Sequence, residues 1–350
     1  MRPSSLLFLL FWIAGAAVAG AASPAALLTH EFVYEKASYP SCHASTIVEP
    51  APGQLVAAWF GGTAEKNPDV GIWVSHYDRA AKRWTPGVEV ANGVQRDGKR
   101  HPTWNPVLFQ PRGGAPLMLF YKVGPSPQTW WGEVRTSTDG GRSWSAARRL
   151  PDGIYGPIKN KPVQLPDGTI LSPTSDETDE RPSKWRIYFE RSTDGGATWT
   201  KTPFFNDGVA IGAIQPSILF PDGPSGSRLQ AVGRTRQGKV FTISSTDAGK
   251  TWGAIALLDG VPNPNSGTDA VTLRDGRHVL VYNPVPKGRT PLVVAVSRDG
   301  REWQQCLTLE DQPGEYSYPA VIQTADGRLH VTYTWKRQRI RHAVIDPAKL

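Results

Sequence analysis

The side chains best suited to chemistry in this 350-residue chain are bases and hydrogen-bonding groups spread from residue 43 to residue 318. The candidates for binding or catalysis are His43, His101, Lys159, Lys161, Arg234, Asn265, Arg289 and Tyr318. A guanidinium group binds a carboxylate through two parallel hydrogen bonds, and imidazole is the commonest acid–base catalyst. If these residues meet in one pocket, that pocket is cationic and fits an anionic ligand such as an acidic sugar.

Several of these residues lie in polar clusters that occupy a comparable place ahead of apolar segments. The clusters span residues 100–105, 156–162 and 263–269. Similar placement in successive structural units would bring the clusters to one end of the molecule. The alternative is that they are ordinary polar loops.

The elements that would position these side chains are indicated by a repeated string, Ser-x-Asp-x-Gly-x-Thr/Ser-Trp. It occurs at residues 137–144, 192–199, 245–252 and, shortened, 297–303, and the first serines are 55, 53 and 52 residues apart. Asp and Gly favour a tight turn, and the closing Trp is a large apolar anchor. Strands are expected before each copy, at residues 133–136, 186–189, 240–243 and 292–295. The string is the Asp box, and we interpret it as structural.

A constant period above about 40 residues is typical of a β-propeller, in which each repeat is one four-stranded sheet. A decayed fifth copy spans residues 75–84, and Asp-Gly or Pro-Gly hairpins recur at Gly53, Gly168, Gly276 and Gly327. Dividing roughly 327 residues by a period of about 54 gives six blades. The predicted fold is therefore all-β, a six-bladed β-propeller with Asp-box hairpins, forming a single domain over residues 24–350.

The N-terminus reads as a secretory signal peptide over residues 1–21, with Arg2, an apolar run at 6–13 and small residues before the expected cleavage site. The run is too short for a membrane span. We expect a periplasmic or secreted bacterial protein with no stable membrane span after signal removal; a retained N-terminal anchor is the alternative.

Composition narrows the classes of partner. The net charge is +8 and the pI about 9.5, but the signal peptide argues against nucleic acid. No metal-ligand spacing and no nucleotide-binding loop is present in the sequence, so neither a cofactor nor a metal is expected. Cys42 and Cys306 could pair in an oxidising compartment, but we expect two buried free thiols.

The order of motifs resembles that of exo-sialidases over essentially the whole mature chain. That resemblance implies an arginine triad holding the sialic acid carboxylate, a tyrosine nucleophile with a glutamate partner, and an aspartate acid/base. Arg234 and Arg289 match the second and third arginines by their place before the third and fourth Asp boxes. Tyr318, nine residues before Gly327, matches the nucleophile, with Tyr316 as a close competitor.

Three positions depart from the sialidase pattern. His43 stands where the first arginine is expected, and Gln215 where the glutamate is expected. An amide cannot accept a proton as a carboxylate does. In the loop expected to hold the acid/base, Glu65 is the candidate acid and Asp69 is interpreted as a structural cap.

Three functions follow from these observations and the resemblance. The first is an exo-acting glycoside hydrolase that removes a terminal acidic sugar from a glycan, with Tyr318, Glu65 and His43 as catalytic residues. The second is a propeller polysaccharide lyase or rhamnosidase acting at a uronic-acid linkage through a histidine-centred site. The third is a non-catalytic glycan-binding propeller. The partner in each case is an acidic glycan, bound by Arg234, Arg289, Gln215, His101, Lys159, Lys161 and Asn265.

Overall fold

A computed structural model describes residues 26–350. The signal peptide prediction falls on residues 1–21, outside the described residues. The regular secondary structure of residues 26–350 consists of β-strands, apart from one short 3₁₀ turn at Pro347–Lys349. Within residues 26–350 no helix is long and apolar enough to cross a membrane.

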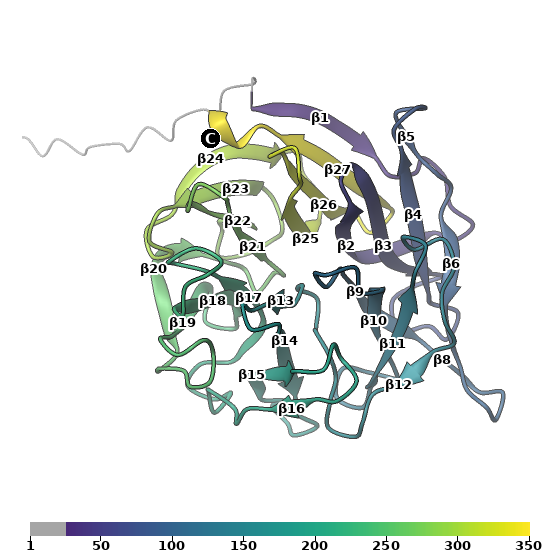
Figure 1. Cartoon of the computed structure of the whole chain (residues 1–350), viewed down its shortest axis with the longest axis horizontal. Helices are drawn as coiled ribbons and strands as arrows, with labels where there is room; N and C mark the ends of the chain where they lie inside the picture. The colour runs from purple at the N-terminus through teal and green to yellow at the C-terminus, as the bar shows by residue number, and fades with distance from the viewer. Residues whose placement is uncertain (1–25) are drawn as a thin grey trace, which may run out of the picture.

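Six small antiparallel sheets are arranged around one axis as the blades of a propeller (Figure 1). From the innermost strand outward, blade 1 consists of β2 (Ser41–Ala51), β3 (Gln54–Gly62), β4 (Gly71–Asp78) and β5 (Arg83–Trp84), and β6 (Val88–Ala91) also pairs with β4. Blade 2 consists of β9 (Thr103–Phe109), β10 (Leu117–Val123), β11 (Trp131–Ser137) and β12 (Arg148–Arg149). Blade 3 consists of β13 (Val163–Gln164), β14 (Ile170–Glu177), β15 (Trp185–Ser192) and β16 (Thr200–Lys201). Blade 4 consists of β17 (Ala213–Leu219), β18 (Leu229–Thr235), β19 (Lys239–Ser245) and β20 (Ala256–Pro262). Blade 5 consists of β21 (Asp269–Thr272), β22 (His278–Tyr282), β23 (Leu292–Ser297) and β24 (Gln304–Glu310). Blade 6 contains β25 (Tyr316–Gln323), β26 (Leu329–Trp335) and β27 (Arg339–Ile345). A small hairpin, β7 (Gly93–Val94) with β8 (Arg100–His101), links the first two blades.

The wheel is closed by the first strand of the described chain. Strand β1 (Leu27–Phe32) pairs with β27 and becomes the outermost strand of blade 6 (Figure 1). The two ends of the domain are thus held in one sheet, and the first and last blades become neighbours. The prediction of an all-β six-bladed propeller is confirmed.

The four Asp boxes connect the third strand of a blade to its fourth strand, as predicted. In the first copy, Gly141 N–H donates to Ser137 Oγ at 2.8 Å and Ser143 N–H donates to Asp139 Oδ1 at 2.9 Å. The equivalent bonds recur in the second and third copies. Hydrogen bonds from Thr198 and Ser192 lower the pKa of Asp194 to about 2, so the carboxylate is kept ionised by the turn itself. These contacts fit a structural role for each box.

The core consists of apolar layers packed between adjacent blades. Large side chains of neighbouring sheets interdigitate there; Trp252 of the third Asp box stacks on Phe189 of the preceding blade with centroids 4.2 Å apart. Strands buried on both faces explain the nearly continuous apolar runs in the second and third strands.

The cysteines are both free. Cys42 is buried on the innermost strand of blade 1, whereas Cys306 is half-exposed on the outermost strand of blade 5. The prediction of free thiols is confirmed, but that of a buried Cys306 is wrong, because an outermost strand leaves one of its faces to solvent.

Candidate active site

Each blade places one non-glycine residue with a left-handed backbone at the same point, in or just before its innermost strand. These residues and their φ angles are Ala44 (53°), Asn105 (41°), Lys159 (71°), Gln215 (58°), Asn265 (60°) and Tyr318 (53°). In four blades the strand register shifts at this point, as a β-bulge requires. A left-handed L-residue costs about 1–2 kcal/mol, and such strain concentrates at functional sites. The six positions, hereafter the axial ring, mark the candidate site.

Tyr318 is the residue on which the other candidates converge. Its ring lies against that of His43, with centroids 4.1 Å apart. On the blade 5 side it is packed on Gly267, where an added Cβ would meet the ring at 2.9 Å. Arg234 Cζ, Arg289 Cζ and Lys159 Nζ lie 5.2, 5.8 and 5.9 Å from the ring centroid. Side chains from five blades therefore meet at one aromatic ring.

Arg234 approaches from the end of β18 and is 6% exposed. Its guanidinium lies 5.2 Å from both the Trp185 ring and the Tyr318 ring, and Nη1 donates to the Asn265 carbonyl at 3.2 Å. Nε is buried with no hydrogen-bond partner. Of the arginines in this cluster, Arg234 is the one with no ion pair to a carboxylate among residues 26–350.

Arg289 is joined to a third arginine that the sequence reasoning missed. Glu315 Oε1 accepts from Arg289 Nη1 at 2.6 Å and from Arg337 Nε at 2.8 Å. Arg337 Nη1 also donates to Glu65 Oε2 at 2.5 Å. Burial alone would raise the pKa of Glu315, but Arg337 and Arg289 hold it below its ordinary value.

Arg337 belongs to the β26–β27 hairpin, where Lys336 and Arg337 both have left-handed φ angles. Its carbonyl accepts from Cys42 N–H at 2.9 Å, so blade 6 delivers an arginine beside His43 of blade 1. His43 is the position where the sialidase pattern places its first arginine. The basic run 336–339 was the only signal in the sequence, and no repeat spacing connected it to the site.

His43 is buried and held by a side chain from blade 6. Its Nδ1 lies 2.9 Å from the Thr334 hydroxyl, which also accepts from Ala44 N–H at 3.1 Å. Nε2 is buried and has no partner. Burial, with the positive charges of Arg337, Arg289, Arg234 and Lys159, holds the pKa of His43 well below its ordinary value. The imidazole is therefore neutral, with one free nitrogen in a cationic environment.

The two predicted lysines lie at the site but their ammonium groups are engaged by the protein. Lys159 Nζ donates to the carbonyl of Thr268 at 2.6 Å and also to the Pro319 carbonyl, spanning the axis from blade 3 to blade 6. Lys161 Nζ lies 2.8 Å from Asp269 Oδ2. Burial, chiefly, lowers the pKa of Lys159 to about 7. This geometry favours a bracing role between blades over direct ligand contact.

The remaining predicted residues are placed as follows. Gln215 and Asn265 occupy the axial ring, and their side-chain oxygens are buried without partners. Glu65 pairs with Arg337, which shares Glu315 with Arg289, and it is Arg289 that lies over the Tyr318 ring. His101 lies apart, on the small hairpin β7–β8, with its ring 5.5 Å from Trp131. Tyr316 is packed in the blade 6 core.

Asp69 closes the loop that carries Glu65, as predicted for a cap. Its Oδ2 accepts from Thr63 N–H at 2.8 Å and from the Thr63 hydroxyl at 2.6 Å. Near this loop, Trp104 and Trp130 are buried against Ile158 and anchor the sheets, whereas Trp131 is half-exposed under Arg149.

The sequence reasoning also missed Glu177, a carboxylate near Arg234. Glu177, at the end of β14, has its pKa raised by burial, although Arg234 and Trp185 partly oppose the shift. No group of three or more His, Cys, Asp or Glu side chains that could hold a metal ion occurs in the described part of the chain.

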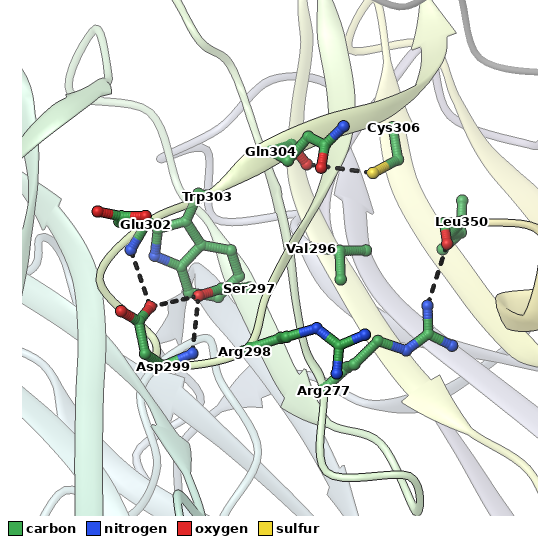
Figure 2. A pocket seen from close by; sticks show the side chains of 10 residues that line it. All are labelled: Arg277, Val296, Ser297, Arg298, Asp299, Glu302, Trp303, Gln304, Cys306 and Leu350. Atoms are coloured by element: carbon green, nitrogen blue, oxygen red, sulfur yellow. Dashed lines mark hydrogen bonds between the residues drawn. The ribbon is translucent and has the colours of Figure 1, made fainter.

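An open hollow of about 640 Å³ lies away from the axis, at the rim of blade 5. Figure 2 shows that it is formed around the fourth Asp box, with Ser297, Asp299 and Trp303 on one side and Arg277 and Leu350 on the other. The polar groups of that box bond one another, and Arg277 donates to the Leu350 carbonyl at 3.1 Å. It shares no residue with the axial cluster.

The family assignment rests on a match over residues 53–331 to the model of the BNR repeat-like domain, which covers most of the chain. The chain belongs to the BNR repeat-like family. With sialidases among its relatives, this BNR repeat protein is a member of the sialidase superfamily.

Two curated relatives and one solved structure illustrate the similarity. The chain is 29% identical over 157 residues to a sialidase of Micromonospora viridifaciens, covering 42% of this chain and 23% of that protein. It is 22% identical over 258 residues to an anhydrosialidase of Macrobdella decora, covering 64% and 33%. The chain thus spans about a quarter to a third of these relatives. A Dyadobacter fermentans protein of unknown function has the same fold, with a TM-score of 0.73, 17% identity and coverage of 93% and 100%.

Proposed function

We propose that this BNR repeat protein is a glycoside hydrolase that removes a terminal acidic sugar, a sialic acid or a related sugar, from a glycan. The observation that carries the proposal is the convergence of Arg234, Arg289 and His43 on the Tyr318 ring. The sialidase relatives support the same class. Membership of the BNR repeat-like family and the similarity to sialidases support a glycosidase activity.

The carboxylate of the sugar is assigned to the arginines. Arg234 has a buried Nε–H without a partner and no ion pair among residues 26–350, and Arg289 and Arg337 share Glu315. Charge-assisted bidentate bonds in a water-poor site are strong and directional. Arg337 thereby supplies a third guanidinium beside His43, which stands where sialidases have their first arginine.

The reaction proceeds through Tyr318 as the attacking group. Its phenol oxygen bonds to the anomeric carbon as the glycosidic C–O bond breaks, and the phenol proton passes to His43 Nε2. Glu65 protonates the leaving oxygen after the sugar carboxylate has replaced it on Arg337 and it has taken up a proton from solvent. Water then displaces the tyrosine oxygen from the anomeric carbon; the proton of water returns to Glu65, and His43 returns its proton to the phenolate. The sum is hydrolysis. A neutral imidazole suits this role because Gln215 cannot accept the proton.

A specific observation favours the lyase alternative as well. The buried, neutral and unpaired Nε2 of His43 is also what a base needs to remove a proton next to a uronate carboxylate held by arginine. In that reaction the C5 proton passes to His43 and the electron pair forms a C4–C5 double bond as the leaving oxygen departs with a proton.

One assay separates these functions. Purified protein is incubated with sialyl, rhamnosyl and uronyl reporter glycans, and product release and near-ultraviolet absorbance are followed together. The hydrolase releases an acidic sugar without new absorbance, the lyase creates an absorbing double bond, and a glycan-binding protein yields no product. Absence of turnover on every acidic glycan would contradict the proposed function.

A further inference from the structure

Most residues of the axial ring have no role in the proposed mechanism. Five of its six residues carry polar side chains, and three of these are the neutral amides Asn105, Gln215 and Asn265. All six blades have a left-handed residue at this position, so the fold tolerates the same backbone strain in every blade. For Asn a left-handed φ is tolerated well, but for Gln215 it is unusual.

The amides on blades 4 and 5 have buried oxygen atoms without partners. Gln215 is 2% exposed, and its Oε1 has no hydrogen bond; the same holds for Oδ1 of Asn265. Their backbones, by contrast, are well bonded: Asn160 Nδ2 donates to the Gln215 carbonyl at 2.8 Å, and Arg234 donates to the Asn265 carbonyl at 3.2 Å. The backbone carbonyls are bonded, whereas the buried amide oxygens have no donor. A buried acceptor without a donor costs about 1–3 kcal/mol, so a partner is expected.

Resting on the proposed function, we propose that Gln215 and Asn265 form a hydroxyl-binding subsite beside Arg234, and that they decide which acidic sugars this site accepts. The carboxylate is held by Arg234, and hydroxyl or amide N–H groups on the same sugar ring donate to Gln215 Oε1 and Asn265 Oδ1. The carboxylate site and the hydroxyl subsite are adjacent, because Arg234 donates a hydrogen bond to the Asn265 carbonyl. Gln215 is thus a binding residue in this chain, at a position where a glutamate would carry charge.

The charges around the subsite support neutral acceptors there. Arg234 is already approached by the half-buried Glu177, whose pKa is raised. A further carboxylate at residue 215 would add a like charge beside Glu177 and compete with the sugar for Arg234. An amide supplies the acceptor without that competition.

The test is a binding experiment that does not depend on turnover. Isothermal titration of the full chain uses N-acetylneuraminic acid and glucuronate as hydroxylated acids, and tetrahydropyran-2-carboxylate as the matched ring acid without hydroxyls. The variants are Gln215→Met, which keeps the length of the side chain, and Asn265→Ala on the neighbouring blade. Gln305→Met, at an exposed position of the outer strand of blade 5, is the control, and circular dichroism confirms the fold of each.

Wild type is expected to bind a hydroxylated acid at least tenfold more tightly than the plain ring acid. In each subsite variant, the ratio of the two affinities is expected to fall by roughly tenfold. The affinity for the plain ring acid should stay within about twofold of wild type. If wild type binds the acids without preferring hydroxyls, or if both variants keep the preference, the subsite is wrong while the proposed function stands. If wild type binds none of the acids, the proposed function fails, and the subsite with it.

Discussion

His43 and Tyr318, from the first and last blades of the wheel, lie ring against ring with centroids 4.1 Å apart. They are 275 residues apart in sequence, and closure of the propeller by β1 makes their blades neighbours. The Thr334 hydroxyl holds the imidazole through Nδ1, and Gly267 leaves room for the phenol. The pair forms the centre of the candidate site.

If His43 and Tyr318 act as one unit, removing either should cost about as much as removing both. We expect His43→Ala and Tyr318→Phe each to lower kcat/KM by roughly 100-fold or more, and the double variant to fall no further. The measurement is a double-mutant cycle on the best acidic reporter glycan. Independent, multiplicative losses would show that the two residues do not cooperate.

Gly267 should be required because of its close approach to Tyr318. An added Cβ would meet the ring at 2.9 Å, and neither the ring nor the backbone can move without disturbing His43. We expect Gly267→Ala to lower kcat/KM by about tenfold or more while changing the midpoint of thermal unfolding little. Gly253→Ala is the matched control, since the nearest atom there is 3.6 Å from the new Cβ. Equal activities of the two variants would remove the packing argument.

The buried guanidinium of Arg234 is expected to hold the carboxylate, so Arg234→Ala should lower kcat/KM on an acidic glycan by about 100-fold or more. Arg236→Ala is the control. Arg236 lies two residues further on, exposed and 4.2 Å from the same Trp185 ring. If the loss is as large in the Arg236 variant, the effect comes from general charge and not from a carboxylate contact.

Acid should destabilise the closing blade through its buried histidines. Burial, chiefly, lowers the pKa of His330 to about 3 and that of His30 to about 4. Both are therefore neutral in the folded protein but protonate in the unfolded chain below about pH 6.5, so stability is complete above that pH and is lost as the pH falls toward 4. The loss for His330 is expected to be on the order of 2 kcal/mol or more.

The check is the free energy of unfolding measured by denaturant between pH 4 and pH 7.5. His330→Gln keeps a hydrogen-bonding group near His342, whose Nε2 is 3.0 Å from His330 Nδ1, but removes the titration. The variant should show a flatter pH dependence than wild type. An unchanged slope would mean that other groups govern acid unfolding.

The fold could be predicted from sequence because each blade repeats the same local chemistry. The Asp boxes, the Asp-Gly hairpins and the apolar runs recur at one period, and those signals are local to a few residues each. The convergence of Arg234, Arg289 and Tyr318 could be expected for the same reason, since equivalent phases of the repeat meet near the axis.

The rest of the site depends on features outside the repeat. Arg337 lies in the β26–β27 turn, outside the recurring Asp-box and Asp-Gly motifs, and Glu315 pairs with it from 22 residues earlier in the chain. The roles of Lys159 and Lys161 could not be predicted, because their hydrogen bonds go to backbone and carboxylate groups more than 100 residues away. His101 is separated from the axis because the small hairpin β7–β8 inserts between blades 1 and 2.

The central claim is that the axial arginines and Tyr318 act on an acidic sugar. It is tested most directly by mass spectrometry of the products released from matched sialylated and desialylated oligosaccharides by wild type and by Arg234→Ala. We predict that wild type releases the intact, saturated acidic sugar from the sialylated chain only, and that the variant releases essentially none. Equal cleavage of the neutral chain, or undiminished release by the variant, would contradict the account.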